Sequence, residues 1–383
     1  MRAQISHTLI IGFDAKRYFN NPTGLGFYSR TLLEGLRRFY PEHQYLLYTP
    51  YNRDKLALVS DGMRMPDSWL GKAFHPLWRS RGITRQLQRD GVEVFHGLSH
   101  ELPNGLKKAG IRSVVSMHDL IFMRFPNLYP PVDRFFYEQK YRRAARQADQ
   151  VVAISEQTKT DLEEFFKIPP QQVQVIGQSC DVVFERLSLR HHPDRLELPL
   201  PGTAGLPAAD YLISVGSLTP RKNWHTLLDA LFLLKNEGLD VPLVAVGAGN
   251  SAYAKGLQEQ SEKLGLQVYW IDEHLQTQTL ALLYRRAAAL VYPSVFEGFG
   301  IPILEAMTVG IPVVTSRGGC FEEVGGAAAL YADPNQAADL ARQISKVLET
   351  ETHQDLVSKI PAQIAHFAPE KICAAWMEVY LGL

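Results

Sequence analysis

The stretch FEGFGIPILEAMTVGIPVVTS, residues 296–316, joins a glycine-containing loop to two apolar segments. Pro302 suits the first turn of a helix, which predicts a helix over 302–309. The run IPVVTS that follows is typical of a buried strand. Two acids, Glu297 and Glu305, stand in this stretch with seven residues between them. The stretch therefore predicts a loop–helix–strand unit with one carboxylate in its loop and one in its helix.

The same alternation of strand and helix signals runs through both halves of the chain. The strand candidates are 8–13, 45–50, 92–97, 113–119, 150–155, 211–217, 241–249, 267–271, 289–294 and 311–316. Strands that alternate with helices indicate parallel sheets covered on both faces. We therefore expect an α/β protein made of two doubly wound, Rossmann-like domains.

Length and composition agree with this expectation. At 383 residues the chain has room for two domains of ordinary size. Lysine plus arginine equals aspartate plus glutamate at 40 each, which gives no support to a nucleic-acid binder. The three cysteines are far apart, so we expect neither a disulfide framework nor a zinc site, and a reducing cytoplasm fits best. The apolar runs are too short for a secretion signal or a membrane-spanning helix.

Proline and glycine mark the boundary between the two domains. Residues 190–210 hold four prolines and two glycines, which is typical of a linker. We expect an N-terminal domain over 1–184, a linker over 185–210, a C-terminal domain over 211–367 and a last helix over 368–383. Open α/β sheets bind ligands beyond the carboxyl ends of their strands, so the loops at those ends are where a site is expected.

Two of those loops carry residues suited to phosphate groups. In NPTGLG, Gly24 and Gly26 precede a helix and would let backbone N–H groups approach an anion; an ordinary glycine turn is the alternative. In LTPRKN, Arg221 and Lys222 stand at an expected helix start, where positive charge is unfavourable unless an anion binds there. A fork donor beside a point charge suits a diphosphate, and a solvated Arg–Lys pair is the alternative.

Other polar residues at strand ends suit sugar hydroxyls. His118 can donate to a hydroxyl or to developing charge, although a lone histidine at a strand end more often has a structural role. Asp14 and Asp119 suit either helix caps or hydrogen-bond anchors on the acceptor side. Carboxylates accept paired hydrogen bonds from vicinal diols, so Glu297 and Glu305 could hold a hexose and a ribose. The alternative is a pair of solvated helix-cap acids, which the apolar surroundings disfavour.

Taken together, the motifs resemble a known enzyme family. FEGFGIPILEAMTVGIPVVTS, with its spacing of acids, resembles the signature of the family 4 retaining glycosyltransferases. GSLTPRKN, NPTGLGFYSR and SMHDLIFMRFPNLYP resemble three further motifs of that family, and the likeness spans almost the whole chain. The last of these is most similar to the bacterial mannosyltransferases of O-antigen and capsule assembly. The chain departs from the family at VIGQSCDVVF, which lacks an Asn-Gly turn but keeps an acid at Asp181.

The resemblance implies a GT-B fold, in which two domains face each other across a cleft and the 368–383 helix crosses back to the N-terminal domain. The catalytic residues that it implies are Glu297, Lys222, Arg221 and His118. The donor-binding residues that it implies are Gly24, Gly26, Gly216, Arg221, Lys222, Gly249, Leu275, Gly298, Phe299, Gly300, Ile301 and Glu305. No metal or other cofactor is expected, because the Arg–Lys pair would neutralise the diphosphate.

The function that we expect is transfer of a hexose from a nucleoside-diphosphate sugar, with mannose from GDP-mannose favoured. The acceptor would be a glycan or a lipid-linked molecule of surface polysaccharide synthesis, and transfer would proceed by front-face substitution with retention. A UDP-sugar-dependent transferase, an epimerase of the same architecture and a non-catalytic sugar-nucleotide-binding protein stay as alternatives. An NAD-dependent oxidoreductase is disfavoured because its GxGxxG loop is absent.

Two basic stretches in the first half leave membrane contact open. HPLWRSRGITRQLQRD, residues 75–90, and RFFYEQKYRRAAR, residues 134–146, mix arginine with aromatic residues and leucine. Such helices can lie on an anionic membrane, which would place the protein peripherally on the inner face of the plasma membrane. A buried apolar face with a solvated basic face explains the same pattern.

Overall fold

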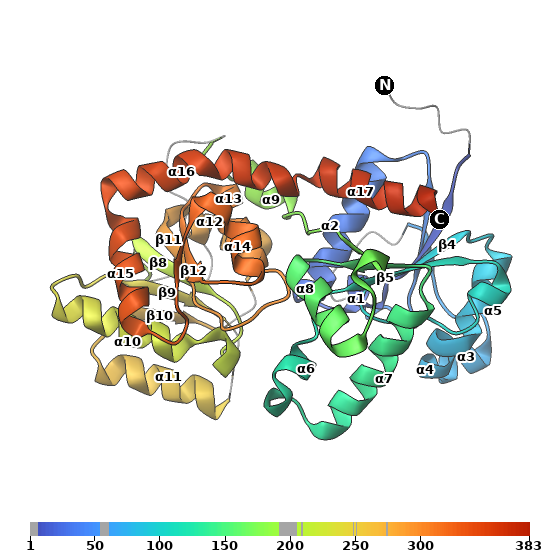
Figure 1. Ribbon diagram of the computed structural model, residues 1–383, viewed down its shortest axis with the longest axis horizontal. Helices are drawn as coiled ribbons and strands as arrows, with labels where there is room; N and C mark the ends of the chain where they lie inside the picture. Colours follow the sequence, from blue (N-terminus) through green and yellow to red (C-terminus); the bar gives the residue numbers. More distant parts are fainter. Residues whose placement is uncertain are drawn as a thin grey trace. The chain divides into compact units, whose positions relative to one another are not determined.

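The chain folds into two compact units (Figure 1). The computed structural model describes residues 7–53, 61–190, 205–207, 210–247, 249, 251–272 and 275–383. The first unit comprises Met1–Ser179 and Ala368–Leu383, and the second comprises Cys180–Phe367. Of the linker expected over 185–210, residues 191–204 and 208–209 lie outside the described residues. No helix in the described part of the chain is both long and apolar enough to cross a membrane.

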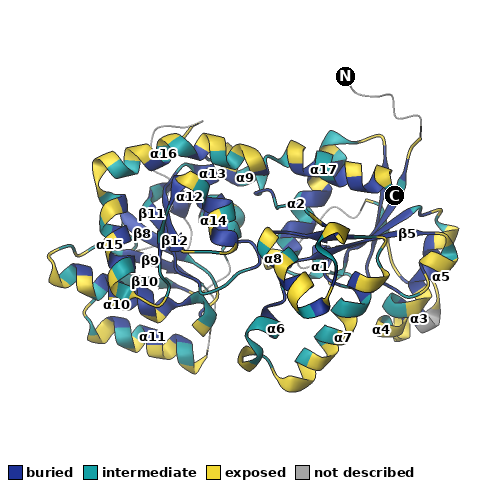
Figure 2. Cartoon of the chain, in the orientation of Figure 1, coloured by how far each residue is buried: buried dark blue, intermediate teal, exposed yellow. Residues whose placement is uncertain are grey.

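The first unit is built on a parallel sheet with the strand order β3-β2-β1-β4-β5-β6-β7. Its strands are β1 (Ile10–Asp14), β2 (Gln44–Tyr48), β3 (Met63–Arg64), β4 (Val94–Gly97), β5 (Arg112–Met117), β6 (Gln150–Ala153) and β7 (Val173–Val175). The central strands β1, β4 and β5 are buried on both faces, which explains their nearly continuous apolar sequences (Figure 2).

Helices cover both faces of this sheet. They are α1 (Lys16–Asn20), α2 (Gly24–Phe39), α3 (Trp69–Ala73), α4 (His75–Leu77), α5 (Ile83–Arg89), α6 (Ile121–Arg124), α7 (Pro131–Gln147), α8 (Glu156–Asp161) and α17 (Pro369–Gly382). Turns of π-helix, Trp78–Gly82 and Leu162–Phe166, continue α4 and α8.

The second unit repeats the architecture, with the strand order β10-β9-β8-β11-β12-β13 and parallel pairing throughout. Its strands are β8 (Tyr211–Val215), β9 (Leu243–Val246), β10 (Val268–Ile271), β11 (Ala287–Tyr292), β12 (Val313–Ser316) and β13 (Ala329–Ala332). Its helices are α9 (Val182–Arg186), α10 (Trp224–Asn236), α11 (Ala252–Lys263), α12 (Thr277–Arg286), α13 (Ile301–Val309), α14 (Cys320–Gly325), α15 (Ala337–Leu348) and α16 (Thr350–Ile364).

Each sheet reverses its strand order at one point. The reversal lies between β1 and β4 in the first unit and between β8 and β11 in the second. Loops that leave the carboxyl ends of two such strands diverge to opposite sides of the sheet, which opens a crevice for ligands. The loops after β8 and β11 are therefore the first place to look for a site in the second unit.

The C-terminal helix α17 forms part of the core of the first unit. Trp376 and Tyr380 are fully buried, and the Trp376 ring lies 4.4 Å from the ring of His96 on β4. A hydrogen-bond chain continues inward, because Nδ1 of His96 lies 2.8 Å from the Tyr380 hydroxyl and Nε2 lies 2.7 Å from Ser116 Oγ. Ser116 Oγ in turn lies 2.8 Å from the Tyr28 hydroxyl on α2, so the chain joins both helices to the sheet.

Close packing of α2 against α17 gives a test of this arrangement. A β-carbon at Gly35 would lie 2.6 Å from Sγ of the buried Cys373. We expect Gly35→Ala to lower the thermal unfolding midpoint, because overpacking costs about 1–3 kcal/mol, which exceeds a helix-propensity gain of about 1 kcal/mol. Adding Cys373→Ala should recover most of the loss.

Gly256 on α11 provides the matched control, because a β-carbon there would meet no atom within 4 Å. Gly256→Ala should leave the unfolding midpoint unchanged or raise it in scanning calorimetry. Equal midpoints for the Gly35→Ala and Gly256→Ala proteins would contradict the packing of α17 on α2.

Candidate active site

The loops after β8 and β11 bring three of the predicted residues into direct contact. Nη1 of Arg221 lies 2.6 Å from Oε1 of Glu297, and Nζ of Lys222 lies 2.7 Å from the same oxygen. Nη1 of Arg221 also donates to the Phe296 carbonyl at 2.5 Å. All three side chains are less than a fifth exposed. One carboxylate oxygen thus holds two cations together at the strand-order reversal.

Asn223 fixes the turn that carries the two cations. Pro220–Lys222 forms a 3-10 turn, and Asn223 follows it in the left-handed conformation with a φ of 61°. The buried Asn223 amide donates to the carbonyls of Pro293, at 3.0 Å, and Pro334, at 2.6 Å. These bonds tie the β8 loop to the loops after β11 and β13, so Asn223 sets the position of the neighbouring cations.

Two further side chains complete the surroundings of Lys222 and Glu297. Nζ of Lys222 donates to the Tyr292 hydroxyl at 2.6 Å and lies 4.8 Å from the centre of that ring. Sγ of Cys320, at the start of α14, donates to the Glu297 carbonyl at 3.2 Å. Neither residue stands in a motif that marks it in the sequence. Only the position of Tyr292 at the end of a predicted strand could have pointed to it.

The charges at this site perturb each other strongly. Burial by itself would raise the pKa of Glu297, but the charges of Lys222 and Arg221 outweigh it and hold that pKa at about 2. Burial lowers the pKa of Lys222, the carboxylate of Glu297 opposes this change, and the charge of Arg221 adds to it. Glu297 therefore stays ionised at every physiological pH and compensates two adjacent cations.

Glycines let the surrounding loops approach each other. A β-carbon at Gly216 would lie 3.2 Å from Cδ of Lys222, and one at Gly249 would lie 2.9 Å from Cβ of Leu218. Gly300 adopts a φ of 96° as the residue before α13, a conformation that disfavours any residue with a β-carbon. The predicted Gly216, Gly249 and Gly300 thus shape the loops at the carboxyl ends of β8, β9 and β11.

The remaining predicted residues of these loops differ in how far their side chains are buried. The Phe299 side chain is buried and packs edge-on against Phe367, with ring centres 5.5 Å apart, so only its backbone is available to a ligand. Gly298 precedes it, and Ile301 begins α13 half-buried. Leu275 is half-buried, and the adjacent residues 273–274 of the expected base-binding loop lie outside the described residues.

Glu305 occupies a separate environment on α13. It is half-buried, and its Oε2 accepts a hydrogen bond from the Tyr284 hydroxyl at 3.1 Å. Burial raises the pKa of Glu305 to about 7, the bond from Tyr284 opposes the rise, and the charge of Asp181 adds to it. The two acids of the signature thus differ: Glu297 is paired with cations, whereas Glu305 is poised to titrate near neutral pH.

In the first unit, Gly24 and Gly26 lie in the first turn of α2, which begins at Gly24 and thus earlier than the sequence analysis placed it. A β-carbon at Gly26 would lie 1.8 Å from the carbonyl oxygen of Asn21, so only glycine fits there. The Asn21 side chain folds the loop by accepting from the Thr23 backbone N–H at 2.7 Å. A β-carbon at Gly24 would meet no atom within 4 Å, which leaves the backbone open on that side.

His118 lies at the end of β5 with one ring nitrogen already bonded. Its Nε2–H donates to the Leu98 carbonyl at 2.8 Å, and its backbone N–H donates to Nε2 of His100 at 2.9 Å. Burial and the neighbouring His100 lower the pKa of His118 to about 3, so its ring is neutral. A neutral ring that donates from Nε2 offers Nδ1 as an acceptor only.

The two predicted acceptor-side acids have different partners. Asp14, at the end of β1, forms an ion pair with Arg79, which also lies 3.5 Å from Glu101. Asp119 accepts a hydrogen bond from the backbone N–H of Ile121, the first residue of α6, at 3.1 Å, which is an Asx turn. Asp14 is thus tied to a mostly buried cation, whereas Asp119 folds the turn that precedes α6.

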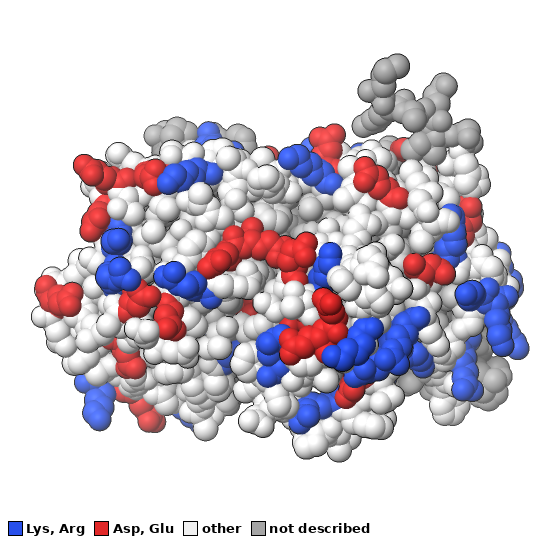
Figure 3. Space-filling model, viewed as in Figure 1, with Lys and Arg blue, Asp and Glu red and all other residues white. Residues whose placement is uncertain are grey.

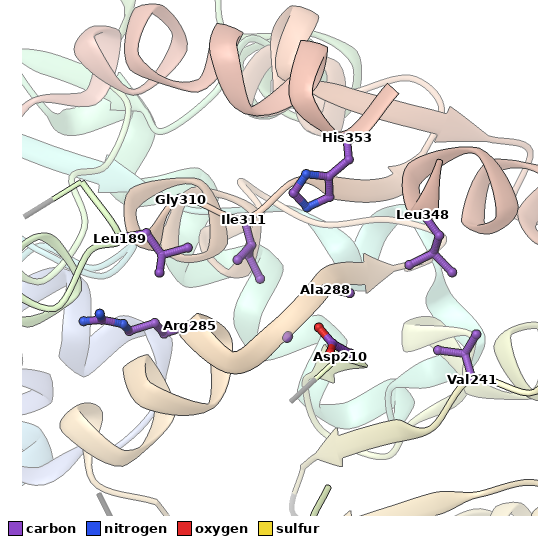
Figure 4. A pocket seen from close by; sticks show the side chains of 10 residues that line it. Leu189, Asp210, Val241, Arg285, Ala288, Gly310, Ile311, Leu348 and His353 are labelled. Atoms are coloured by element: carbon purple, nitrogen blue, oxygen red, sulfur yellow. The ribbon is translucent and has the colours of Figure 1, made fainter. Parts of the chain in front are cut away.

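A cavity in the second unit lies away from these residues (Figure 4). Its volume is about 530 Å³, and its lining includes Asp210, Ala287 and Ile311, which stand at the amino ends of β8, β11 and β12. None of the predicted site residues lines it. Because ligands of open α/β sheets bind at the carboxyl ends of the strands, this cavity is not the candidate site.

Comparison with known sequences identifies the family. The family described as "Glycosyl transferases group 1" matches residues 207–362, and "Glycosyltransferase Family 4" matches residues 22–183. The two matches together span most of both units, and the chain belongs to the glycosyltransferases that these two descriptions cover. An O-antigen chain mannosyltransferase B from Escherichia coli is 28% identical over 75% of this chain and 74% of its own length. The O-antigen chain mannosyltransferase RfbU from Salmonella typhimurium is 24% identical over 66% of this chain and 65% of its own length.

Solved structures agree on the fold. HepE from Anabaena, in complex with UDP-glucose, superposes with a TM-score of 0.74 at 19% identity over 98% of this chain and all of its own. WaaG, a glycosyltransferase involved in lipopolysaccharide biosynthesis, superposes with a TM-score of 0.68 at 18% identity. The superposition covers 95% of this chain and 99% of WaaG. The expected GT-B fold is therefore confirmed, and the protein is a glycosyltransferase related to O-antigen mannosyltransferases.

Asn223 gives a test of how the cation turn is held. We expect Asn223→Gly to lower the free energy of unfolding by about 2 kcal/mol, because buried carbonyl groups lose their donors. Asn223→Ala should cost about 1 kcal/mol more, because alanine resists the left-handed conformation. Urea unfolding of both variants measures the difference. An Asn223→Ala protein as stable as the Asn223→Gly protein would show that the backbone conformation is not what the asparagine maintains.

Proposed function

We propose that the protein transfers a hexose, mannose from GDP-mannose, to a glycan or lipid-linked acceptor of surface polysaccharide synthesis. The observation that carries the proposal is the adjacent pair Arg221 and Lys222, held on one carboxylate at the strand-order reversal. A nucleoside diphosphate presents two negative charges a few ångströms apart, which matches a fork donor beside a point charge. The mannosyltransferase names of the sequence relatives support the choice of sugar.

An exchange of partners would link donor binding to catalysis. In the structure Glu297 neutralises both cations. A bound diphosphate competes for the same cations, which frees the Glu297 carboxylate to accept hydrogen bonds from hydroxyls of the hexose. Glu305, on α13, would accept the ribose hydroxyls, and the open N-terminus of that helix would face the phosphates. Glu297 would then bind the hexose of the donor, and Glu305 would bind its ribose.

The same cations account for leaving-group stabilisation without a metal. Negative charge grows on the diphosphate as the sugar–phosphate bond breaks, and Arg221 and Lys222 are already placed to meet it. We infer retention by front-face substitution, in which the departing diphosphate takes the proton of the acceptor hydroxyl. His118 of the first unit would accept a hydrogen bond from a donor-sugar hydroxyl through Nδ1.

Three buried, unpaired cysteines suit a reducing cytoplasm, where we place the reaction.

A binding panel tests the proposal directly. Purified protein is titrated calorimetrically with GDP-mannose, UDP-glucose, UDP-N-acetylglucosamine and NAD, each with magnesium and with EDTA. We expect GDP-mannose to bind with equal affinity in both buffers, and to raise the unfolding temperature because only the native state binds it. Preferential binding of a UDP-sugar would show that the donor is not GDP-mannose, but it would leave the assignment to the glycosyltransferases unchanged. Binding of NAD alone, or of no nucleotide sugar, would overturn the assignment.

Lys222 separates transition-state stabilisation from simple donor binding. We expect Lys222→Ala to lower kcat roughly 10²–10³-fold, because the cation acts on charge that develops as the bond breaks. Lys235→Ala is the control: Lys235 is a partly exposed lysine of the same unit that lies 3.9 Å from Asp240, and its loss should leave kcat unchanged. Steady-state kinetics that show an unchanged kcat and a raised KM for Lys222→Ala would assign Lys222 to ground-state binding only.

The raised pKa of Glu305 predicts that donor affinity depends on pH. A carboxylate must be ionised to accept both hydroxyls of a ribose, whereas the free protein holds a proton on Glu305 below pH 7. Affinity for GDP-mannose should therefore be constant above about pH 8 and fall as pH drops, approaching about tenfold per pH unit below the pKa. Glu305→Gln should bind more weakly at pH 8 but lose this dependence, and a wild-type affinity that is flat from pH 6 to pH 8 would refute the role.

A further inference from the structure

A buried tyrosine holds one oxygen of the Glu305 carboxylate. The Tyr284 side chain, on α12, is fully buried, and its hydroxyl donates to Oε2 of Glu305 at 3.1 Å. The other carboxylate oxygen, Oε1, has no hydrogen-bond partner among the residues that the structure describes. A carboxylate oxygen without a partner can accept a hydrogen bond from a ligand hydroxyl. Tyr284 therefore fixes one oxygen of Glu305 and leaves the other available.

Packing of three helices holds the tyrosine ring in place. Helix α12 packs against α13, and both pack against α9. The Tyr284 ring meets the ring of the buried Phe184, on α9, edge-on with centres 6.0 Å apart. Because side chains in close-packed cores stay in one rotamer, the Tyr284 hydroxyl keeps one direction. That direction is toward Glu305.

The Tyr284 hydroxyl acts on Glu305 as a donor. Burial raises the pKa of Tyr284 well above its usual value, and the charge of Glu305 adds to the rise, so the hydroxyl keeps its proton at every physiological pH. A hydrogen bond donated to a carboxylate favours its ionised form. The bond from Tyr284 therefore opposes the effect of burial on the pKa of Glu305.

Asp181 acts on Glu305 in the opposite direction. It precedes α9, where its side chain accepts from the backbone N–H of Val183 at 2.9 Å, and its negative charge raises the pKa of Glu305. The neighbouring Cys180 is buried, and burial raises the pKa of its thiol so far that the thiol stays neutral. Among the described residues, Tyr284 and Asp181 are the side chains that shift the pKa of Glu305.

The surface charge of the protein does not explain the raised pKa. Figure 3 shows Lys and Arg side chains as well as Asp and Glu side chains on the visible face of the second unit. The whole chain has a formal net charge of zero. Exposed charges more than about 8–10 Å away are largely screened by salt. Burial and the two contacting side chains therefore set the pKa of Glu305.

We propose that Tyr284 is a positioning residue, whose hydroxyl fixes Oε2 of Glu305 and leaves Oε1 to accept a ribose hydroxyl of the donor. Tyr284 acts through Glu305 rather than on the donor itself. The inference rests on the proposed function for the ribose, but the bond and its effect on Glu305 need no ligand. One consequence is that donor binding releases a proton near pH 7, because Glu305 is partly protonated in the free protein and ionised in the complex.

A titration of Glu305 without any ligand tests the tyrosine first. Carboxyl-carbon NMR of protein with isotope-labelled glutamate follows each acid, and Glu305→Gln identifies the Glu305 resonance by its loss. We expect the wild type to titrate with a midpoint at about pH 7. Tyr284→Phe should move this midpoint upward by about 0.5–1 pH unit, because the ionised form loses a donor. An unchanged midpoint in Tyr284→Phe would overturn the proposal.

Two other changes should move the same midpoint downward. Asp181→Asn removes the charge but keeps a side chain that can cap α9. Fluorotyrosine at position 284 keeps the ring and has a more acidic hydroxyl, which is a stronger donor, so it tests the bond even if Tyr284→Phe does not fold. Failure of either midpoint to move downward would contradict the opposing effects of the two side chains.

Tyr211→Phe is the matched control. Tyr211 is also fully buried in the second unit, but its hydroxyl donates to the backbone carbonyl of Leu283, at 2.7 Å, and not to an acid. We expect Tyr211→Phe and Tyr284→Phe to lower the unfolding temperature similarly, because each loses one buried hydrogen bond. Only Tyr284→Phe should raise the Glu305 midpoint. Equal shifts in the two proteins would indicate a general loosening of the unit and overturn the positioning role.

Calorimetry with GDP-mannose separates this inference from the proposed function. Tyr284→Phe should bind about twofold to fivefold more weakly than the wild type at pH 7, and within about twofold of it at pH 9, where Glu305 is ionised in both proteins. Wild-type binding at pH 7 should release about half a proton, measured from the dependence of the binding enthalpy on the buffer.

The two measurements fail in different ways. If the NMR midpoints shift as expected but Tyr284→Phe binds GDP-mannose like the wild type at pH 7, Glu305 does not hold the ribose. The proposed role of Glu305 would then fail, and with it the part of Tyr284 in donor binding. If GDP-mannose binds and the NMR midpoint of Tyr284→Phe is unchanged, the role of Tyr284 alone is refuted.

Discussion

The site depends on one electrostatic constraint: two cations that are adjacent in sequence share a single carboxylate oxygen. Arg221 and Lys222 repel each other, and their side chains are mostly buried, so the pair needs an anion. Glu297 supplies it in the free protein, and the low pKa of Glu297 measures how strongly the cations favour its charge. A diphosphate could take over that role without any change in the positions of the cations, because the loops already hold them.

The rest of the second unit holds this arrangement in place. The strand-order reversal sends the loops after β8 and β11 to opposite sides of the sheet, and the Asn223 amide bonds carbonyls of the β11 loop and of the chain after β13. Gly216 lets the β8 loop fold back beside Lys222. Preorganised charges of this kind stabilise a transition state more effectively than charges that must first be collected, because no reorganisation is needed during the reaction.

Sequence reasoning predicted the central parts of the fold better than its edges. Strands such as β5 and β11 are buried on both faces. Their sequences are therefore nearly continuous apolar runs, from which the strands could be predicted. The strands β3, β7 and β13 were not predicted. Each lies at the edge of its sheet and has two to four residues, so it carries little pattern. The glycine at position 26 was recognised as special, but the carbonyl that excludes a β-carbon there is a tertiary contact.

The site shows the same division between local and tertiary information. The sequence placed Arg221, Lys222 and Glu297 at strand ends, because loop position follows from the strand pattern. It did not indicate Tyr292 or the left-handed Asn223, whose roles arise from contacts with distant loops. Nor did it distinguish the two glutamates, because the cations beside Glu297 and the burial of Glu305 shift their pKa values in opposite directions. The bond from Tyr284 to Glu305 likewise required the packing of α12 against α13 to be known.

A crystal structure of the protein with GDP-mannose, grown in the presence of EDTA, tests the central claim most directly. The account predicts diphosphate oxygens within about 3 Å of Arg221 and Lys222, with the Glu297 carboxylate turned to the hydroxyls of the hexose. A complex in which Glu297 still holds both cations while the diphosphate lies elsewhere would contradict it.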